Sequence, residues 1–183
     1  MTGEWEVNIE TNYDDLPDKI KDAFTNIDAS SMGTYEFIAY LGSKTVNDVT
    51  HHAILTKYFL INNIQNVKNV VLMMYAEDSE GKWTSVNDTL LLDGSYESGI
   101  KVVICDDDVE DDAIALFDET FGEIADVTRT AIAVLATQSV DEATKYYYAT
   151  EEASVADNDS PKSVTIVSIL DTDKSYEEIV KVI

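Results

Sequence analysis

An internal repeat constrains the fold of this chain more than any other feature of its sequence. Residues 131–151, AIAVLATQSVDEATKYYYATE, repeat residues 37–57, FIAYLGSKTVNDVTHHAILTK, at a distance of 94 residues (131 − 37). The copies share six residues without a gap: Ile38, Ala39, Leu41, Val46, Thr50 and Thr56 match Ile132, Ala133, Leu135, Val140, Thr144 and Thr150. A period of this length exceeds the roughly 20–50 residues of a solenoid repeat and is the size of a small domain. The sequence therefore predicts two similar domains, residues 1–93 and 94–183.

The repeat extends beyond this segment in both directions. We expect the offset of 94 residues to hold to the end of the chain, so that Val70 matches Val164 and Val86 matches Val180. Upstream, an adjustment of one residue aligns four apolar positions, Leu16, Ile20, Ala23 and Phe24, with Val109, Ala113, Leu116 and Phe117. Spacings of four, three and one residue place these side chains on one face of a helix.

Each half is expected to hold the same order of elements, β-α-β-β-β-β. The first half predicts strands at 5–9, 35–41, 51–61, 70–75 and 86–92, with a helix that begins near Asp14, Asp15 and Pro17. The second predicts strands at 100–104, 131–135, 145–155, 164–170 and 178–183, with a helix that follows Asp106, Asp107 and Asp108. Acidic residues favour a helix start because they meet the positive end of its dipole. Four strands joined by hairpins after one helix predict an α+β fold in which an antiparallel sheet curls over that helix.

This order of elements, and the segment LGSKTVNDVTHHAIL, resemble the cystatin family, in which a Gln-x-Val-x-Gly loop joins the second and third strands. The matching positions are Lys44, Val46 and Asp48 in the first half and Gln138, Val140 and Glu142 in the second. Both copies keep the Val, the second keeps the Gln, and neither keeps the Gly. The chain also looks like a tandem version of small bacterial proteins of unassigned function that carry a similar degenerate segment.

The resemblance implies a binding edge at one end of each sheet. That edge would consist of the loops at 43–49 and 78–83 in the first half and at 137–143 and 172–176 in the second. The candidate partner-binding residues are Lys44, Val46, Asn47, Asp48, Trp83, Gln138, Val140, Asp141 and Glu142. Trp83 has two interpretations: an exposed interface anchor, or the first residue of a strand that packs on the sheet.

The missing glycine argues against inhibition of papain-like proteases. A loop that enters a narrow cleft benefits from glycine, whereas the carboxylate at Asp48 or Glu142 must be desolvated there. A degenerate protease inhibitor therefore remains an alternative to the main prediction.

The formal net charge of −24 limits the partners that this chain can bind. Arg129 is the only arginine, and phosphate contacts require Lys and Arg, so we expect no direct binding of nucleic acid. Three explanations of the charge are open: solvated acidic faces, attraction to a partner with a basic surface, and mimicry of a phosphate backbone by an acidic decoy.

The sequence predicts neither a cofactor nor a metal site. Cys105 is the single cysteine and is interpreted as a core residue. The adjacent His51 and His52 point to opposite faces of a predicted strand, so they cannot chelate one metal, and we expect both at the edge of that strand. The acidic run from Asp171 places Tyr176 and Val182 where a calcium loop needs Gly and Glu. No Gly-x-Ser-x-Gly motif or phosphate-binding loop is present, so the chain is not expected to be an enzyme.

Neither a membrane span nor a signal peptide is expected. No run of about 18 apolar residues occurs, and MTGEWEVNIE lacks a basic and an apolar region. The chain is therefore expected in the cytoplasm, or outside the cell if it is a mature form.

In the strands, Met73 and Val167 back other apolar residues, which predicts that the sheet face away from the helix is covered by the sister domain or by a second chain in a homodimer. The main prediction is a non-enzymatic protein that binds another macromolecule, most simply a protein.

Overall fold

The computed structural model describes residues 3–30, 33–60, 68–94, 96–97, 100–104, 110–122, 127–154 and 162–183. The chain divides into two compact units, Met1–Asp93 and Gly94–Ile183. Each unit combines one α-helix with an antiparallel sheet, so the fold is α+β and mostly strand, as predicted. No helix in these ranges is long and apolar enough to cross a membrane.

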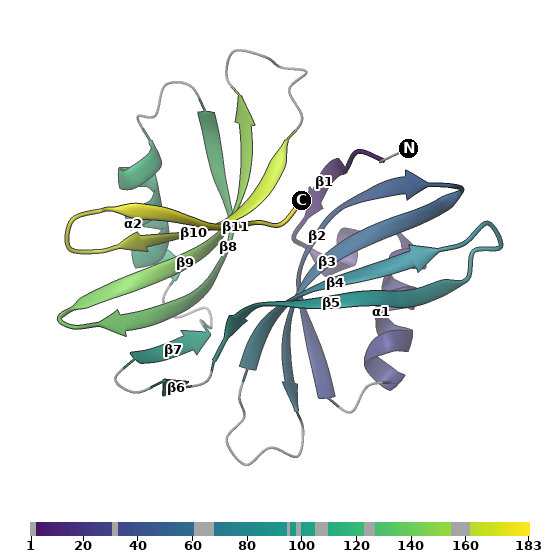
Figure 1. Cartoon of the computed structure of the whole chain (residues 1–183), viewed down its shortest axis with the longest axis horizontal. Helices are drawn as coiled ribbons and strands as arrows, with labels where there is room; N and C mark the ends of the chain where they lie inside the picture. The colour runs from purple at the N-terminus through teal and green to yellow at the C-terminus, as the bar shows by residue number, and fades with distance from the viewer. Residues whose placement is uncertain are drawn as a thin grey trace. The chain divides into compact units, whose positions relative to one another are not determined.

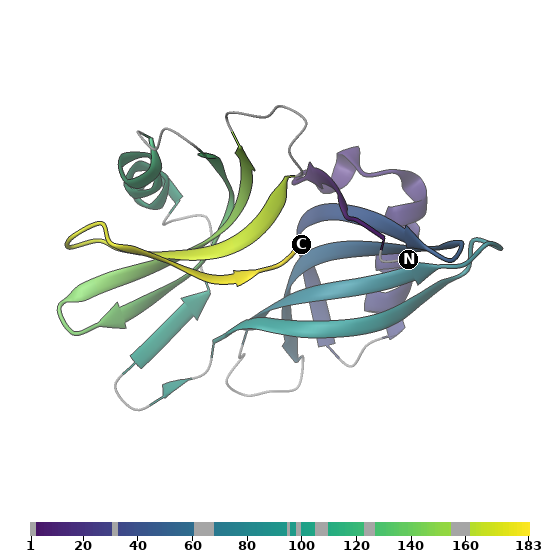
Figure 2. The same ribbon diagram turned by 45° about the horizontal axis from the view of Figure 1, so that its top comes forward.

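Unit 1 contains a five-stranded sheet in the order β1-β2-β3-β4-β5. Its elements are β1 (Glu6–Glu10), a 3-10 helix η1 (Tyr13–Asp15), α1 (Asp18–Ser30), β2 (Gly33–Val46), β3 (Val49–Leu60), β4 (Lys68–Glu77) and β5 (Trp83–Asp93). The sheet curls, and α1 lies against one of its faces (Figure 1). Figure 2 shows the twist of β2 to β5 around that helix.

Unit 2 repeats this order and adds one short strand. Its sheet has the order β11-β10-β9-β8-β7-β6. Its elements are β6 (Tyr96–Glu97), β7 (Ile100–Ile104), α2 (Glu110–Phe121), β8 (Val127–Val140), β9 (Ala143–Ser154), β10 (Ser163–Leu170) and β11 (Tyr176–Lys181). The predicted acidic start at 106–108, Val109 and Cys105 lie outside the described residues.

Helix α1 begins at Asp18, directly after Pro17. The backbone carbonyl of Pro17 accepts hydrogen bonds from the N–H groups of Ile20 and Lys21, and Asp18 lies in the first turn. In α2 the first turn is more acidic, with Glu110, Asp111 and Asp112, which meet the positive end of the dipole.

The apolar face of each helix buries against the sheet. In unit 1 the core consists of Leu16, Ile20, Phe24, Tyr40, Ile54, Val71, Met73 and Tyr75. In unit 2 it consists of Ala113, Phe117, Phe121, Tyr148, Val167 and Ile169. Ile20 and Phe24 match Ala113 and Phe117, so the helical alignment predicted from the sequence places the same positions in both cores.

The structure corrects which sheet face carries Met73 and Val167. Both side chains pack in the helix-facing cores, because they alternate along β4 and β10 with the residues of the other face. The second face instead carries Val70 and Leu72 in unit 1 and Val164 and Ile166 in unit 2, all of them buried. That the sister domain or a second chain covers this second face stays a prediction.

The pairing registers show the duplication in detail. Bulges interrupt the β2–β3 pair between Phe37 and Ala39, and the β8–β9 pair between Ala131 and Ala133, at the predicted offset of 94 residues. The offset does not hold in the last strand: Val71 pairs with Leu90, whereas Thr165, its match, pairs with Lys181, an offset of 91 (181 − 90). The prediction that Val86 matches Val180 is therefore wrong, because the two final hairpins differ in length and in the positions of their bulges.

Candidate functional site

The loops predicted to bind a partner are tighter than expected. Strands β2 and β3 are joined by Asn47 and Asp48 alone, both with positive φ (51° and 62°), as in a two-residue type I′ hairpin. In unit 2 the turn is Asp141 and Glu142, and Asp141 has a φ of 53°. Only these turn residues project beyond the paired strands, whereas the sequence predicts loops that span 43–49 and 137–143.

The other predicted loop residues belong to strands and have contacts within their own unit. The ammonium of Lys44 lies 4.9 Å from the ring centroid of Trp5. Val46 packs close to Gly3: a Cβ added to Gly3 would lie 2.9 Å from Val46 Cγ2. The hydroxyl of Tyr147 donates a hydrogen bond of 2.6 Å to Gln138 Oε1. Val140 is the last residue of β8 and pairs with Ala143.

Trp83 packs on the sheet of unit 1, as the second of its two interpretations predicts, and its role as an interface anchor stays a prediction. It is the first residue of β5, is half-buried and contacts the helix-facing core. Its indole stacks on the imidazole of His52, with ring centroids 4.5 Å apart and an interplanar angle of 30°. It pairs with Glu77, which pairs with Thr50, so it lies at the end of the sheet that also carries the turn Asn47–Asp48.

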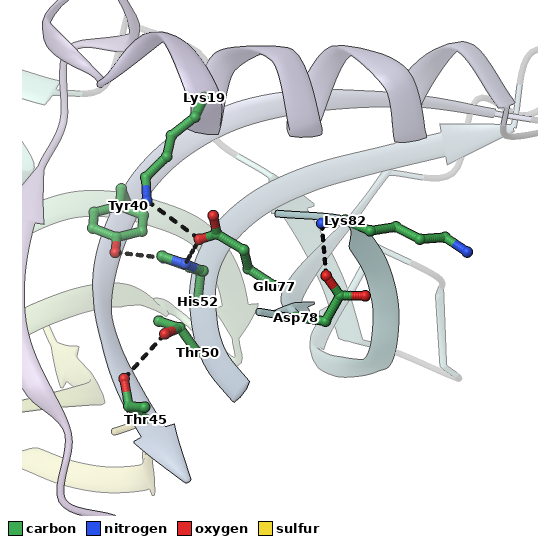
Figure 3. Close-up of polar contacts among 8 residues, drawn as sticks. All are labelled: Lys19, Tyr40, Thr45, Thr50, His52, Glu77, Asp78 and Lys82. Atoms are coloured by element: carbon green, nitrogen blue, oxygen red, sulfur yellow. Dashed lines mark hydrogen bonds and ion pairs between the residues drawn. The ribbon is translucent and has the colours of Figure 1, made fainter. Parts of the chain in front are cut away.

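A polar network lies beside Trp83 and joins four elements of unit 1 (Figure 3). Tyr40 Oη on β2 lies 2.9 Å from His52 Nδ1 on β3, and His52 Nε2 lies 3.3 Å from Glu77 Oε2 on β4. The same carboxylate oxygen pairs with Lys19 Nζ from α1 at 3.3 Å. The prediction that His52 lies at the edge of a strand is therefore wrong: β3 is a central strand, and His52 is 4% exposed.

Burial controls the ionisation of this network. It lowers the pKa of His52, against the hydrogen bond and the charge of Glu77, which raise it. It also raises the pKa of Tyr40. Neutral His52 can accept from the Tyr40 hydroxyl at Nδ1 and donate to Glu77 at Nε2, which satisfies all three groups.

An open pocket of about 370 Å³ adjoins the network on its outer side, lined by Lys19, Asp22, Ala23, Asn26, Gly81 and Trp83. Neither Tyr40 nor His52 lines it. The contacts of this network hold α1, β2, β3 and β4 together.

Unit 2 does not carry the residues of this network. Val134, Tyr146 and Asp171 stand 94 residues after Tyr40, His52 and Glu77. Asp171 instead joins the end of β10 to the start of β9, because its Oδ1 accepts a hydrogen bond of 3.0 Å from the backbone N–H of Thr144. The duplication thus preserved the fold but not the polar cluster.

The polar cluster of unit 2 is organised by Arg129, whose structural role the sequence analysis missed. Its guanidinium lies over the rings of Phe121 and Tyr176, at 4.8 and 5.2 Å from their centroids. It pairs with Glu152 at 3.3 Å and with Glu178 at a shorter distance. Nη1 is buried without a hydrogen-bond partner among the described residues. The only signal in the sequence is that a single arginine occurs among so many carboxylates.

No group of three or more His, Cys, Asp or Glu side chains in the described ranges could hold a metal ion. Unit 2 has an open pocket of about 380 Å³, which is lined partly by Glu152, Thr165 and Glu178. Thr165 donates a hydrogen bond of 2.5 Å to Glu152 Oε1, so these groups serve one another.

The exposed apolar side chains gather on two strands. Among the described residues six large hydrophobic side chains are exposed: Val86, Leu90, Ile114, Tyr176, Ile179 and Val180. Five of these belong to β5 or β11, which are edge strands of the two sheets. Edge strands offer unpaired N–H and C=O groups in addition to side chains. One edge of each sheet therefore combines exposed apolar side chains with unpaired backbone groups, whereas the role of the predicted loops stays a prediction.

Comparison of the chain with family models, with curated proteins and with solved structures finds no match.

Proposed function

We propose that this chain is a non-enzymatic binding protein that recognises another protein through the exposed edges of its two sheets. The observation that carries the proposal is the location of five exposed apolar side chains on the edge strands β5 and β11. Exposed apolar groups next to unpaired backbone groups favour association with a further strand.

The charge supports a partner with a basic surface. The chain carries 36 acidic against 12 basic side chains. Several of the few cations are already paired, as Lys19 is with Glu77, Lys145 with Glu177 and Lys162 with Glu151. The excess of carboxylates attracts a cationic partner over long distances and repels nucleic acid.

The two polar clusters support a role other than catalysis. The Tyr40–His52–Glu77 network and the Arg129 cluster are satisfied mainly by contacts within their own unit. Both hold secondary-structure elements together, and neither Tyr40 nor His52 lines the adjoining pocket. The exposed turn residues Asn47, Asp48, Asp141 and Glu142 stay predicted contact residues that supplement the edges.

An affinity-capture experiment tests the proposal. The full chain is immobilised, exposed to host lysate and compared with two variants: an edge variant that combines Val86→Lys, Leu90→Lys, Ile179→Lys and Val180→Lys, and a matched variant, Ile114→Lys, on the exposed face of α2. We expect the unchanged chain and the Ile114 variant to retain the same discrete protein, and the edge variant to lose it. Capture of no protein, or equal capture by all three, would contradict the proposal.

The identity of the captured protein separates the two alternatives. A papain-like protease would favour the degenerate inhibitor, and inhibition of its activity would then be measured directly. A nucleic-acid-binding protein whose capture nucleic acid abolishes would favour the acidic decoy.

A further inference from the structure

Strand β5 differs from the other edge strands in having little protection against pairing. Seven consecutive residues, 84–90, are exposed, and among the described strands only β4 pairs with β5. Between Thr84 and Leu92 the single charge is Asp88, and neither Lys, Arg nor Pro occurs. Charged residues, prolines and short lengths are the usual means by which proteins keep edge strands from pairing.

The other edges carry these protections. Strand β1 has five residues and begins and ends with a glutamate, Glu6 and Glu10, and β6 has two residues. Strand β11 carries Glu177, Glu178 and Lys181, and the two glutamates pair with Lys145 and Arg129. Of the four edges in the described sheets, β5 is therefore the least protected against a further strand.

The register defines the usable part of β5. Bulges at Val86 and Leu91 interrupt its pairing with β4, and the four residues between them, 87–90, pair without interruption. Asp88 and Leu90 lie opposite Met73 and Val71, which belong to the helix-facing core, so both are on the helix-facing side of the sheet. An added strand would thus meet one carboxylate and one leucine, two residues apart, on the same face.

The charge selects the occupant. A second copy of this chain would bring another net charge of −24 to the edge, and antiparallel self-pairing centred on Asp88 would place two carboxylates opposite each other. A segment with a basic side chain opposite Asp88 and an apolar side chain two residues away gains a charge pair and a contact with Leu90.

We propose that β5 is the docking site for an extended segment of a partner protein, which adds an antiparallel or parallel strand to the edge at 87–90 and places a Lys or Arg beside Asp88. This inference rests on the proposed function and names the edge and the chemistry of the partner segment. Backbone hydrogen bonds would supply affinity, and the alternation of apolar and basic side chains would supply specificity.

A peptide titration followed by amide NMR tests the inference on the full chain. The probe is the capped heptapeptide TVTKTVT, and the matched probes carry Gln or Glu in place of Lys. We expect the Lys probe to shift the amide signals of β5 and its neighbour β4. Because a favourable cross-strand pair is replaced, we expect the Gln probe to bind about two- to fivefold more weakly and the Glu probe more weakly still.

Two variants locate the contact. Asp88→Asn should weaken the Lys probe to the level of the Gln probe and leave the Gln probe unchanged. Leu90→Lys should weaken all probes by about tenfold or more, as a charged edge opposes pairing. Ile114→Lys on α2, outside both edges, is the matched control and should leave binding unchanged. The dispersion of each variant's own amide spectrum reports that it is folded.

Backbone methylation shows whether the peptide binds as a strand. Two forms of the Lys probe are methylated at alternate amide nitrogens, one on each of its edges. Only the form whose methyl groups face β5 should lose binding, because the N–H groups of one strand edge point toward one neighbour. Equal binding by both forms, signal shifts away from β5, or no shifts at millimolar peptide would overturn the inference. Concentration-dependent β5 shifts without peptide would do so as well, by showing a second copy as the occupant.

The lysate capture and the peptide titration together distinguish failure of the proposed function from failure of the inference about β5. If capture from lysate requires Ile179 and Val180 but not Leu90, the chain binds a partner through β11 and the inference about β5 is wrong. If the Lys probe binds β5 but the chain captures no protein, the edge is a peptide site and the proposed function is wrong.

Discussion

The imidazole of His52 stacks on the indole of Trp83 at a centroid distance of 4.5 Å, and its two nitrogens lie within hydrogen-bonding distance of Tyr40 and Glu77. This arrangement joins an aromatic contact to a polar network on the helix-facing side of unit 1. It makes the stability of that unit sensitive to the charge of one buried side chain.

The free energy of unfolding of unit 1 should decrease as the pH is lowered below about 6.5, the ordinary pKa of histidine. Burial lowers the pKa of His52 in the folded state, so between the two pKa values the unfolded state binds more protons and the free energy of unfolding rises with pH. Urea denaturation at a series of pH values measures this slope. The variant His52→Gln should have a smaller slope in this window than the unchanged chain. Equal slopes in the two proteins would contradict the role given to His52.

Replacement of Trp83 should destabilise unit 1. Trp83→Ala removes the ring that covers His52 and part of the core, and because Trp83 is only half-buried the expected loss is about 1–3 kcal/mol. Trp83→Phe keeps a ring and should lose less. Chemical denaturation gives both values. An unchanged free energy of unfolding for Trp83→Ala would restore the interpretation of Trp83 as an exposed anchor.

Removal of Arg129 should leave two carboxylates without their partner. Arg129→Met is expected to cost about 2–3 kcal/mol, less than for a fully buried pair because Glu178 is half exposed. The double variant Arg129→Met with Glu152→Gln should regain part of this loss, since it removes the less exposed of the two charges. Thermal and urea denaturation measure both. Greater loss in the double variant than in the single one would show that Glu152 is stabilised by groups other than Arg129.

The tyrosine titration should report the charge on the β5 edge. Burial, followed by the charge of Asp88, raises the pKa of Tyr35 to about 12. Stability is therefore expected to fall as the pH rises from about 10 to about 12, because the unfolded state releases this proton first. Asp88→Asn should lower the pKa of Tyr35, which ultraviolet titration of the phenolate measures. A pKa that does not move would show that Asp88 is too solvated to act on Tyr35.

The duplication, the order of elements and the core positions of both helices could be predicted from the amino-acid sequence alone. These follow from local patterns: identical residues at one spacing, apolar residues on one helical face, and turn residues between β-rich runs. Such patterns lie within a window of a few residues, so the spacing of Ile20, Phe24, Ala113 and Phe117 is enough to assign them to the two cores. The β-α-β-β-β-β order follows from the same patterns.

The folded structure was needed to establish the face of Met73 and Val167, the register of the last strand, and the surroundings of His52 and Arg129. Strands β4 and β10 are apolar on both faces, so the alternation of side chains alone does not tell which face meets the helix. The bulges that set the offset to 91 residues at Leu90 and Lys181 arise from pairing between strands and leave no mark in either strand's composition. His52 meets Trp83, Tyr40 and Glu77 because the sheet curls and brings distant elements together, and contacts between residues so far apart in the chain exist only after folding.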